Sequence, residues 1–316
     1  MAVTGGAVVT VGEALGVLDA GEGRLEEVDR YEAGVAGAEL NYAVDLARLG
    51  VAVRYFGAVG DDPFGRRVVR TLRAEGLDAS DVSVDQSRPT GLLFKGRSLP
   101  GGEREVVYRR RHSAASAYVP PAALAQAARA ARGVHATGIS LMLGEGMAEA
   151  VRTLFEEGAG APWRSFDLNV RLRLAPAEAW RAALEAMLAP GRVLFASASD
   201  LAAIGLGPEE LVGRCRRRGV AAVVRSADHG ALVATADGRE RRVPPVPEAV
   251  PVDPVGAGDA FAAAVTAWRL ADAPWEEAVR AGQWAGAMVV RLRGDFAGAP
   301  YRHELEALLA GAGPSR

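Results

Sequence analysis

The sequence predicts an α/β fold with a mostly parallel central sheet and helices on both of its faces. Short apolar runs alternate with longer stretches of helical spacing through most of the 316 residues. Prolines stand at or near the starts of several of the helical stretches. When strands and helices alternate in this way, the strands run parallel and the helices cover both faces of the sheet.

The expected strands are short and rich in valine and alanine, and several are bounded by glycine. In chain order they occupy residues 7–12, 51–59, 133–139, 165–168, 192–196, 220–225 and 231–235. In a parallel sheet of this kind, a ligand binds beyond the carboxyl ends of the strands. We therefore expect the functional site at that edge of the sheet.

The expected helices show apolar residues at helical spacing. In chain order they occupy residues 39–49, 65–75, 121–131, 147–157, 176–188, 208–218, 258–270 and 275–291. Pro121, Pro176, Pro208 and Pro274 fall at or near four of the starts. The first amides of a helix have no partner within it, so a proline there costs little.

Two segments, residues 16–35 and 90–112, interrupt the alternation. Both lack a helical pattern and mix polar and apolar residues with glycines, and residues 92–94 and 106–108 have the composition of strands. We expect the two segments to pair as a small β lid over the main sheet, because a flap of this kind would exclude water from a reacting site. Two long surface hairpins are the alternative.

Composition excludes several classes of protein. Lys+Arg 37 against Asp+Glu 39 gives a net charge of -2, so no overall field attracts the chain to nucleic acid or to an anionic membrane. The single cysteine, Cys215, excludes an internal disulfide framework and a multi-cysteine zinc site. No apolar run approaches the ~18 residues of a membrane span, and no basic segment precedes an apolar one at the N-terminus. We expect a soluble, cytoplasmic protein.

The most informative string is Asp253-Pro-Val-Gly-Ala-Gly-Asp-Ala-Phe261, which leads into an expected helix. Gly256 and Gly258 permit a tight turn that presents backbone N–H groups to a ligand. At the start of a helix, such N–H groups stabilise an anion. Asp259 would stand beside the bound anion and accept a proton. The string therefore indicates a hydroxyl that attacks a phosphate, which is kinase chemistry.

Other phosphate and nucleotide motifs are missing. A P-loop needs Gly-x-x-x-x-Gly-Lys-Ser/Thr, but the only lysine, Lys95, follows Phe94 and precedes Gly96. The protein-kinase motifs are absent, and residues 12–16 do not supply the glycines of a dinucleotide site. The charge of a transferring phosphate must then be met by the 256–258 amides, by arginine and by a metal ion.

The Asp253–Phe261 string resembles the C-terminal signature of the ribokinase-like (PfkB) carbohydrate kinases. The N-terminal signature of that family is similar to Ala36-Gly-Ala-Glu-Leu-Asn41, Leu49-Gly50 and Val59-Gly-Asp-Asp-Pro-Phe-Gly65. The resemblance runs from about Val11 to Leu309. Within the family the chain looks most like 2-keto-3-deoxygluconate kinases, through Gly37-Ala-Glu-x-Asn41, Tyr108-Arg-Arg110 ahead of Ser113-Ala114, Asp167-x-Asn-x-Arg171, and Arg293-Gly-Asp295 ahead of Gly298-Ala-Pro-Tyr301.

The resemblance implies one ribokinase-like domain over residues 1–316, with the lid segments inserted in the α/β core. It also implies ATP-dependent phosphorylation of a sugar or sugar acid at a terminal hydroxyl, with 2-keto-3-deoxygluconate first among the substrates. ATP and Mg²⁺ would be the cofactors, and a homodimer through the lid is a further expectation. Another sugar kinase of the family, of fructokinase or ribokinase type, or a weakly active binding homologue is the alternative.

The resemblance also implies site residues. Asp259 would be the general base, and the amides of Gly256, Ala257 and Gly258 would stabilise the phosphoryl group. Substrate contacts would come from Gly37, Asn41, Tyr108, Arg110, Arg171 and Asp295. Nucleotide contacts would come from Asn169, Ser197, Arg225, Ala227, Gly230 and Gln283. Asp200 would hold Mg²⁺ through water.

Each assignment has an ordinary alternative. Arg110 and Arg171 lie near other arginines and could belong to a solvated face, and Asn41 could be an ordinary helix residue. The sequence also departs from the family at four places. Leu93 replaces a tyrosine, Ser197 to Asp200 replaces Asn-x-x-Glu, and Arg225-Ser-Ala-Asp-His-Gly230 replaces Lys-x-Gly-x-x-Gly. Val17 stands near the place of a first-strand aspartate, a difference that 2-keto-3-deoxygluconate kinases share.

Overall fold

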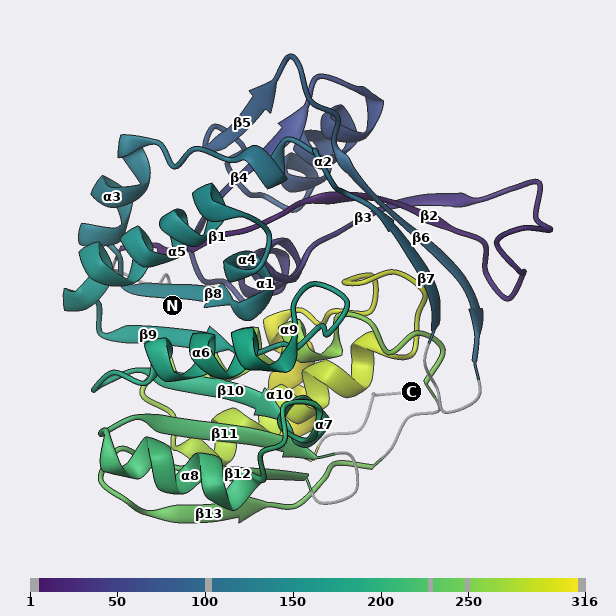
Figure 1. Ribbon diagram of the computed structural model, residues 1–316. Helices are drawn as coiled ribbons and strands as arrows, with labels where there is room; N and C mark the ends of the chain where they lie inside the picture. Colours follow the sequence, from purple (N-terminus) through teal and green to yellow (C-terminus); the bar gives the residue numbers. More distant parts are fainter. Residues whose placement is uncertain (1–5, 100–103, 227–229, 248–250, 312–316) are drawn as a thin grey trace.

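A nine-stranded sheet forms the centre of the protein, in a computed structural model that describes residues 6–99, 104–226, 230–247 and 251–311. Its strand order is β13-β12-β11-β10-β9-β8-β1-β4-β5 (Figure 1). The strands are β1 (Val8–Val11), β4 (Val53–Gly60), β5 (Val82–Asp85), β8 (Gly133–Thr137), β9 (Trp163–Asp167), β10 (Val193–Ser197), β11 (Ala221–Ser226), β12 (Gly230–Ala234) and β13 (Glu240–Val243). All seven expected strands are present.

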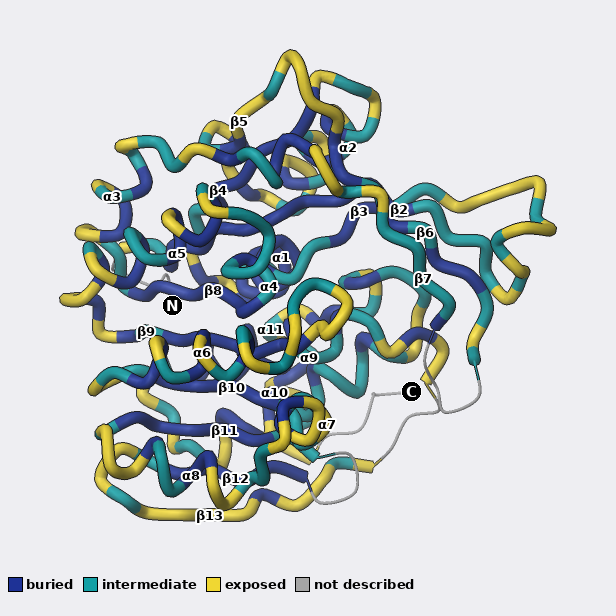
Figure 2. Tube along the Cα trace, viewed as in Figure 1, coloured by how far each residue is buried: buried dark blue, intermediate teal, exposed yellow. Residues whose placement is uncertain are grey.

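The sheet is parallel from β5 to β11, whereas β12 and β13 are antiparallel to their neighbours. Only three residues separate the end of β11 from the start of β12 in the sequence, which is too few for the crossover that a parallel pair needs, so the two strands pair antiparallel. Strands β5 and β13 were not predicted from the sequence. Figure 2 shows β13 exposed at one edge of the sheet, and its residues Glu-Arg-Arg-Val form no apolar run.

Helices cover both faces of this sheet (Figure 1). Residues of α3, α5, α6 and α8 pack in one apolar cluster, and residues of α1, α9, α10 and α11 pack in another. Alternate residues of a strand serve opposite faces: Val9 belongs to the first cluster and Val8 to the second. The bounds are α1 (Ala38–Arg48), α2 (Pro63–Ala74), α3 (Ala122–Arg129), α4 (Gly138–Leu141), α5 (Glu145–Glu157), α6 (Ala177–Met187), α7 (Ala198–Ala203), α8 (Pro208–Arg217), α9 (Ala257–Leu270), α10 (Trp275–Val289) and α11 (Arg302–Leu309).

All eight expected helices are present, and the short helices α4, α7 and α11 were not expected. The sequence does contain a helix-start signal for α7. Ser197 and Asp200 form a capping box, in which each side chain accepts a hydrogen bond from the backbone N–H of the other residue. From the sequence, this Ser-x-x-Asp string was interpreted only as a variant of a metal motif.

The two segments that interrupt the alternation pair in a second, four-stranded sheet of order β3-β2-β6-β7, called the small sheet below. Its strands are β2 (Leu15–Asp19), β3 (Glu32–Ala36), β6 (Gly91–Ser98) and β7 (Arg104–Arg109). Leu15, Val17, Ala36 and Leu93 form its own buried apolar cluster. Figure 1 shows the small sheet projecting from the β1 and β4 side of the main sheet. The expected pairing of the segments is therefore confirmed.

Candidate active site

A cavity of about 670 Å³ lies at the carboxyl ends of the central strands, as expected for this topology. Residues at or just beyond the ends of five parallel strands line it: Glu13, Ile139, Asn169, Ser197 and Ser226. The small sheet forms another wall, with Leu15, Ala36, Leu93 and Tyr108. The cavity therefore lies between the main sheet and the small sheet.

The cavity brings together the predicted site residues from distant parts of the chain. Ala227 lies outside the described residues. The other predicted residues all line the cavity: Gly37, Asn41, Tyr108, Arg110, Asn169, Arg171, Ser197, Asp200, Arg225, Gly230, Gly256, Ala257, Gly258, Asp259, Gln283 and Asp295.

The glycine turn, residues 256–258, begins the central helix α9. Gly256 is the N-cap and has a left-handed φ of 87°, which a residue with a side chain rarely adopts. A Cβ on Gly256 would also lie 1.8 Å from the backbone oxygen of Asp295. Glycine is thus required here by both backbone conformation and space. Residues 256–259 line the cavity, and the first amides of α9 have no partner within the helix, so they are available to an anion bound there.

Asp259 lies in the first turn of α9, and its carboxylate is buried. Asn41 Nδ2, from α1, donates to Asp259 Oδ2 at 2.8 Å and to Asp295 Oδ2 at 3.4 Å. Burial raises the pKa of Asp259 well above its ordinary value, the nearby charges of Asp167 and Asp295 add to this, and the Asn41 hydrogen bond opposes it. A carboxylate with a raised pKa is a stronger base, which suits it to accept a proton.

Arg225, at the end of β11, places a guanidinium beside the glycine turn. Its Nη2 donates to Asp167 Oδ2 at 3.0 Å, and its Cζ lies 5.3 Å from the centre of the Phe261 ring. A Cβ on Gly258 would lie only 2.7 Å from Arg225 Nη1. Within the described part of the chain, Arg225 Nε and Nη1 are buried and have no hydrogen-bond partner. The arrangement offers fixed donors to an anion at the turn.

Arg110 is held inside the cavity and does not belong to a solvated face, so the solvated-face alternative is wrong for this residue, although its neighbours Arg109 and Arg111 are exposed. Its side chain is 13% exposed, Nη1 donates to Glu13 Oε2 at 2.8 Å, and Cζ lies 4.3 Å from the centre of the Tyr108 ring. Burial raises the pKa of Glu13, against the effect of Arg110. Any anion that binds Arg110 would compete with Glu13.

Arg171 lies at the rim of the cavity. Its side chain is 49% exposed, and Nη1 donates to the backbone oxygen of Val170 at 2.7 Å. Asn169, just before it, adopts a left-handed φ of 44°, which asparagine tolerates better than most residues. The Asp167-x-Asn-x-Arg171 string therefore turns at the edge of the sheet, with Arg171 half-exposed at the rim of the cavity.

Asp200 already has several hydrogen-bond donors. Oδ2 accepts from Ser197 Oγ at 2.6 Å and Oδ1 accepts from the Val170 amide at 3.0 Å. Among the residues that the structure describes, no group of three or more His, Cys, Asp or Glu side chains is arranged to hold a metal ion. The cavity therefore provides single carboxylates and no closed metal cage.

Two further residues were given no role in the site from the sequence, although Glu39 lies within the Gly37-Ala-Glu-x-Asn41 string. Glu39 is buried, and its Oε1 accepts from the Thr137 amide at 2.9 Å, Thr137 Oγ1 at 2.8 Å and Ser140 Oγ at 2.7 Å. It ties the start of α1 to β8 and α4. Lys95 lies behind the cavity wall, and its only signal in the sequence is that it is the single lysine.

The chain is similar to known proteins that carry out the same kind of chemistry. Residues 6–301 match the family model described as pfkB family carbohydrate kinase. A 2-dehydro-3-deoxygluconokinase from Thermoproteus tenax is 36% identical over 313 residues, which cover 96% of this chain and 94% of that protein.

Two solved structures are also similar. A PfkB protein from Polaromonas sp. JS666 has a TM-score of 0.82 and 32% identity, over 95% of this chain and 99% of that one. A putative ribokinase II from E. coli, in complex with ATP and Mg²⁺, has a TM-score of 0.85 and 25% identity, over 97% of this chain and 99% of that one. Among the described residues, no helix has the length and apolar character needed to cross a membrane. The protein has a ribokinase-like fold, and the chain belongs to the pfkB family of carbohydrate kinases.

Proposed function

We propose that this protein phosphorylates a sugar acid at its terminal hydroxyl with ATP, and that 2-keto-3-deoxygluconate, which would become the 6-phosphate, is its substrate. The observation that carries the proposal is the placement of Asp259. Its buried carboxylate, held by Asn41, lies in the first turn of α9 directly after the amides of the glycine turn. A base and an anion site in one cavity are what transfer of a phosphoryl group to a hydroxyl requires.

In this proposal Asp259 accepts the proton of the attacking hydroxyl. Asn41 donates to Oδ2 of that carboxylate and so fixes its orientation. The amides of the glycine turn and the unpartnered donors of Arg225 would stabilise charge on the transferring phosphoryl group. Since phosphoryl transfer needs little covalent chemistry from the protein, positioning and charge stabilisation account for most of the rate.

Magnesium fits the cavity as an ion held mainly by nucleotide phosphates. Mg²⁺ in such sites keeps several waters and uses only one or two protein carboxylates. Asp200 lines the cavity, and its oxygens could accept a hydrogen bond from a metal-bound water in addition to their protein donors. The ion would neutralise charge on the phosphates.

The acid group of the substrate would be recognised by arginine. Arg110 and Arg171 both line the cavity, one fixed by Glu13 and one at the rim. The name of the Thermoproteus tenax relative, a 2-dehydro-3-deoxygluconokinase, supports a sugar acid over a neutral sugar. Leu93 offers no hydroxyl to the substrate from the small sheet. We further propose that the small sheet closes as a lid and joins two copies of the chain as a homodimer.

A coupled assay of ADP release tests the proposal. We expect turnover with 2-keto-3-deoxygluconate to exceed that with 2-keto-3-deoxygalactonate, fructose, ribose and nucleosides, and Asp259→Asn to lower it by at least about 100-fold. If fructose or ribose is the best substrate, the sugar-acid assignment is wrong and the enzyme is a kinase of neutral sugars. Thermal stabilisation by these ligands without any ADP release would contradict catalysis and support a binding homologue.

A further inference from the structure

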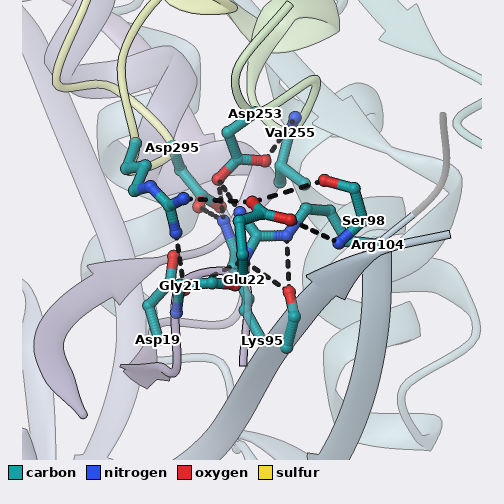
Figure 3. A network of polar contacts seen from close by, with 11 residues as sticks. Asp19, Gly21, Glu22, Lys95, Ser98, Arg104, Asp253, Val255 and Asp295 are labelled. Carbon is teal, nitrogen blue, oxygen red and sulfur yellow. Dashed lines mark hydrogen bonds and ion pairs between the residues drawn. The ribbon is translucent and has the colours of Figure 1, made fainter. Parts of the chain in front are cut away.

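The only lysine of the chain lies buried between two carboxylates behind the cavity. Lys95 belongs to β6 of the small sheet, and its side chain is fully buried. Its Nζ lies 3.1 Å from Asp253 Oδ2 and also contacts Asp295 Oδ1 (Figure 3). Both carboxylates belong to loops of the α/β core, 158 and 200 residues away in sequence. The lysine therefore joins the small sheet to the core.

Arg104, from the neighbouring strand β7, completes this cluster (Figure 3). Its Nη1 lies 3.6 Å from Asp253 Oδ2, and its Nη2 donates to Asp19 Oδ1 at 2.9 Å. The same Nη2 donates to the backbone oxygen of Gly21 at 3.0 Å. Two buried cations, Lys95 and Arg104, thus pair with the carboxylates of Asp253, Asp295 and Asp19. These pairs join strands β2, β6 and β7 to the loops that carry Asp253 and Asp295. Buried charges of this kind are tolerated only when they are paired.

Asp253 and Asp295 each accept one further hydrogen bond that links them to the reacting groups. Asp253 Oδ1 accepts from the Val255 amide at 3.2 Å, immediately before the glycine turn. Asp295 Oδ2 accepts from Asn41 Nδ2 at 3.4 Å, and the same Nδ2 holds the base Asp259 at 2.8 Å.

The backbone adds a second link. The oxygen of Asp295 packs so closely on Gly256 that a Cβ there would lie 1.8 Å away. A shift of Asp295 would therefore move both the glycine turn and the amide that orients the base.

Lys95 itself is not among the residues that line the cavity. Burial lowers its pKa, but the carboxylates of Asp295 and Asp253 outweigh this effect and keep the pKa above its ordinary value. The ammonium group thus remains charged and cannot reach a substrate. Its contacts can act only on the two loops that it holds.

We propose that Lys95 is a positioning residue, through which the small sheet sets the glycine turn and the Asn41–Asp259 pair for phosphoryl transfer. The inference rests on the proposed kinase function. Lys95 would then affect the reaction although it touches neither sugar nor nucleotide. Closure of the small sheet would also be needed to bring the reacting groups into place.

Variants at position 95 test this role by kinetics. Lys95→Met removes the charge and keeps most of the volume, Lys95→Arg keeps the charge, and Arg109→Met is the matched control because Arg109 is exposed on β7. We expect kcat of Lys95→Met to fall on the order of 100-fold, since a displacement of about 1 Å can have that effect. The KM for ATP should stay within about threefold. Lys95→Arg should recover most of kcat, and Arg109→Met should match the wild type.

A folded Lys95→Met with the kcat of Arg109→Met would overturn the proposal, because a merely structural lysine changes stability alone. A spectroscopic test covers the case in which Lys95→Met does not fold. Carbon-13 lysine labelling of the wild type gives a single Cε resonance. That resonance should shift when Mg²⁺ and a non-hydrolysable ATP analogue bind, and an unchanged resonance in the bound protein would refute the coupling. If the wild type shows no turnover with any substrate, the proposed kinase function is wrong. The spectroscopic test of the coupling between Lys95 and the nucleotide site still applies in that case.

Discussion

Replacement of Gly256 by alanine should disable the enzyme through geometry alone. The new Cβ would lie 1.8 Å from the Asp295 oxygen, whereas real Cβ contacts are essentially never under 3.0 Å. The turn or the Asp295 loop must therefore move by about 1 Å, which can lower a rate on the order of 100-fold. The left-handed φ of 87° adds a backbone cost of about 1–2 kcal/mol. We expect kcat to fall about 100-fold and the unfolding free energy to fall by about 2 kcal/mol.

Gly50→Ala provides the matched control. Gly50 has a similar left-handed φ of 79°, but a Cβ there would meet nothing within 4 Å. This variant should lose about 1–2 kcal/mol of stability and keep its kcat. Chemical denaturation measures the first quantity and ADP release the second. If Gly256→Ala and Gly50→Ala have the same kcat, the close packing of Asp295 on the glycine turn does not position the reacting groups.

Three other predictions concern charge. Asp259→Asn should lower kcat by about 10²–10⁴-fold while ATP still stabilises the protein against heat, and unchanged kcat would exclude Asp259 as the base. Arg110→Ala should raise the KM for the sugar acid at least tenfold relative to Arg109→Ala, and an equal KM would rule out Arg110 as the carboxylate contact.

The third of these predictions uses Asp45, on α1, which is buried with no hydrogen-bond partner for either oxygen among the described residues, and burial raises its pKa well above 3.8. A folded protein that keeps a proton which the unfolded chain releases loses stability as the pH rises above that unfolded value. Asp45→Asn should therefore gain stability relative to the wild type as the pH rises above about 4, by up to about 1.4 kcal/mol per pH unit, as followed by urea denaturation. A difference that does not change with pH would show that Asp45 is ionised in the folded protein.

Much of the fold was predictable because its signals are local. The central strands are buried apolar runs, and the glycine turn is a continuous string that includes Gly256, whose backbone conformation only glycine adopts readily. The edge strand β13 gave no such signal because exposure leaves its residues polar. The short helix α7 was hidden because its capping residues were assigned to a metal motif.

The partners of the charged site residues were not predictable. Arg110 pairs with Glu13 across 97 residues, and Lys95 pairs with Asp253 across 158. No periodicity or spacing encodes such a pair, since it exists only once the small sheet has packed against the core. The motif residues could be identified from the sequence, but the groups that hold them in place could not.

The position of Lys95 has a chemical consequence for an enzyme whose proposed substrate carries a keto group. A free amine condenses with a ketone to form an imine, and lysine is the side chain that does this in proteins. Here the sole lysine side chain is sealed from solvent and kept as an ammonium ion by two carboxylates, so it has no lone pair to attack a carbonyl. A reactive keto sugar can therefore occupy the cavity, which three arginines line, without modifying a lysine of the enzyme that binds it.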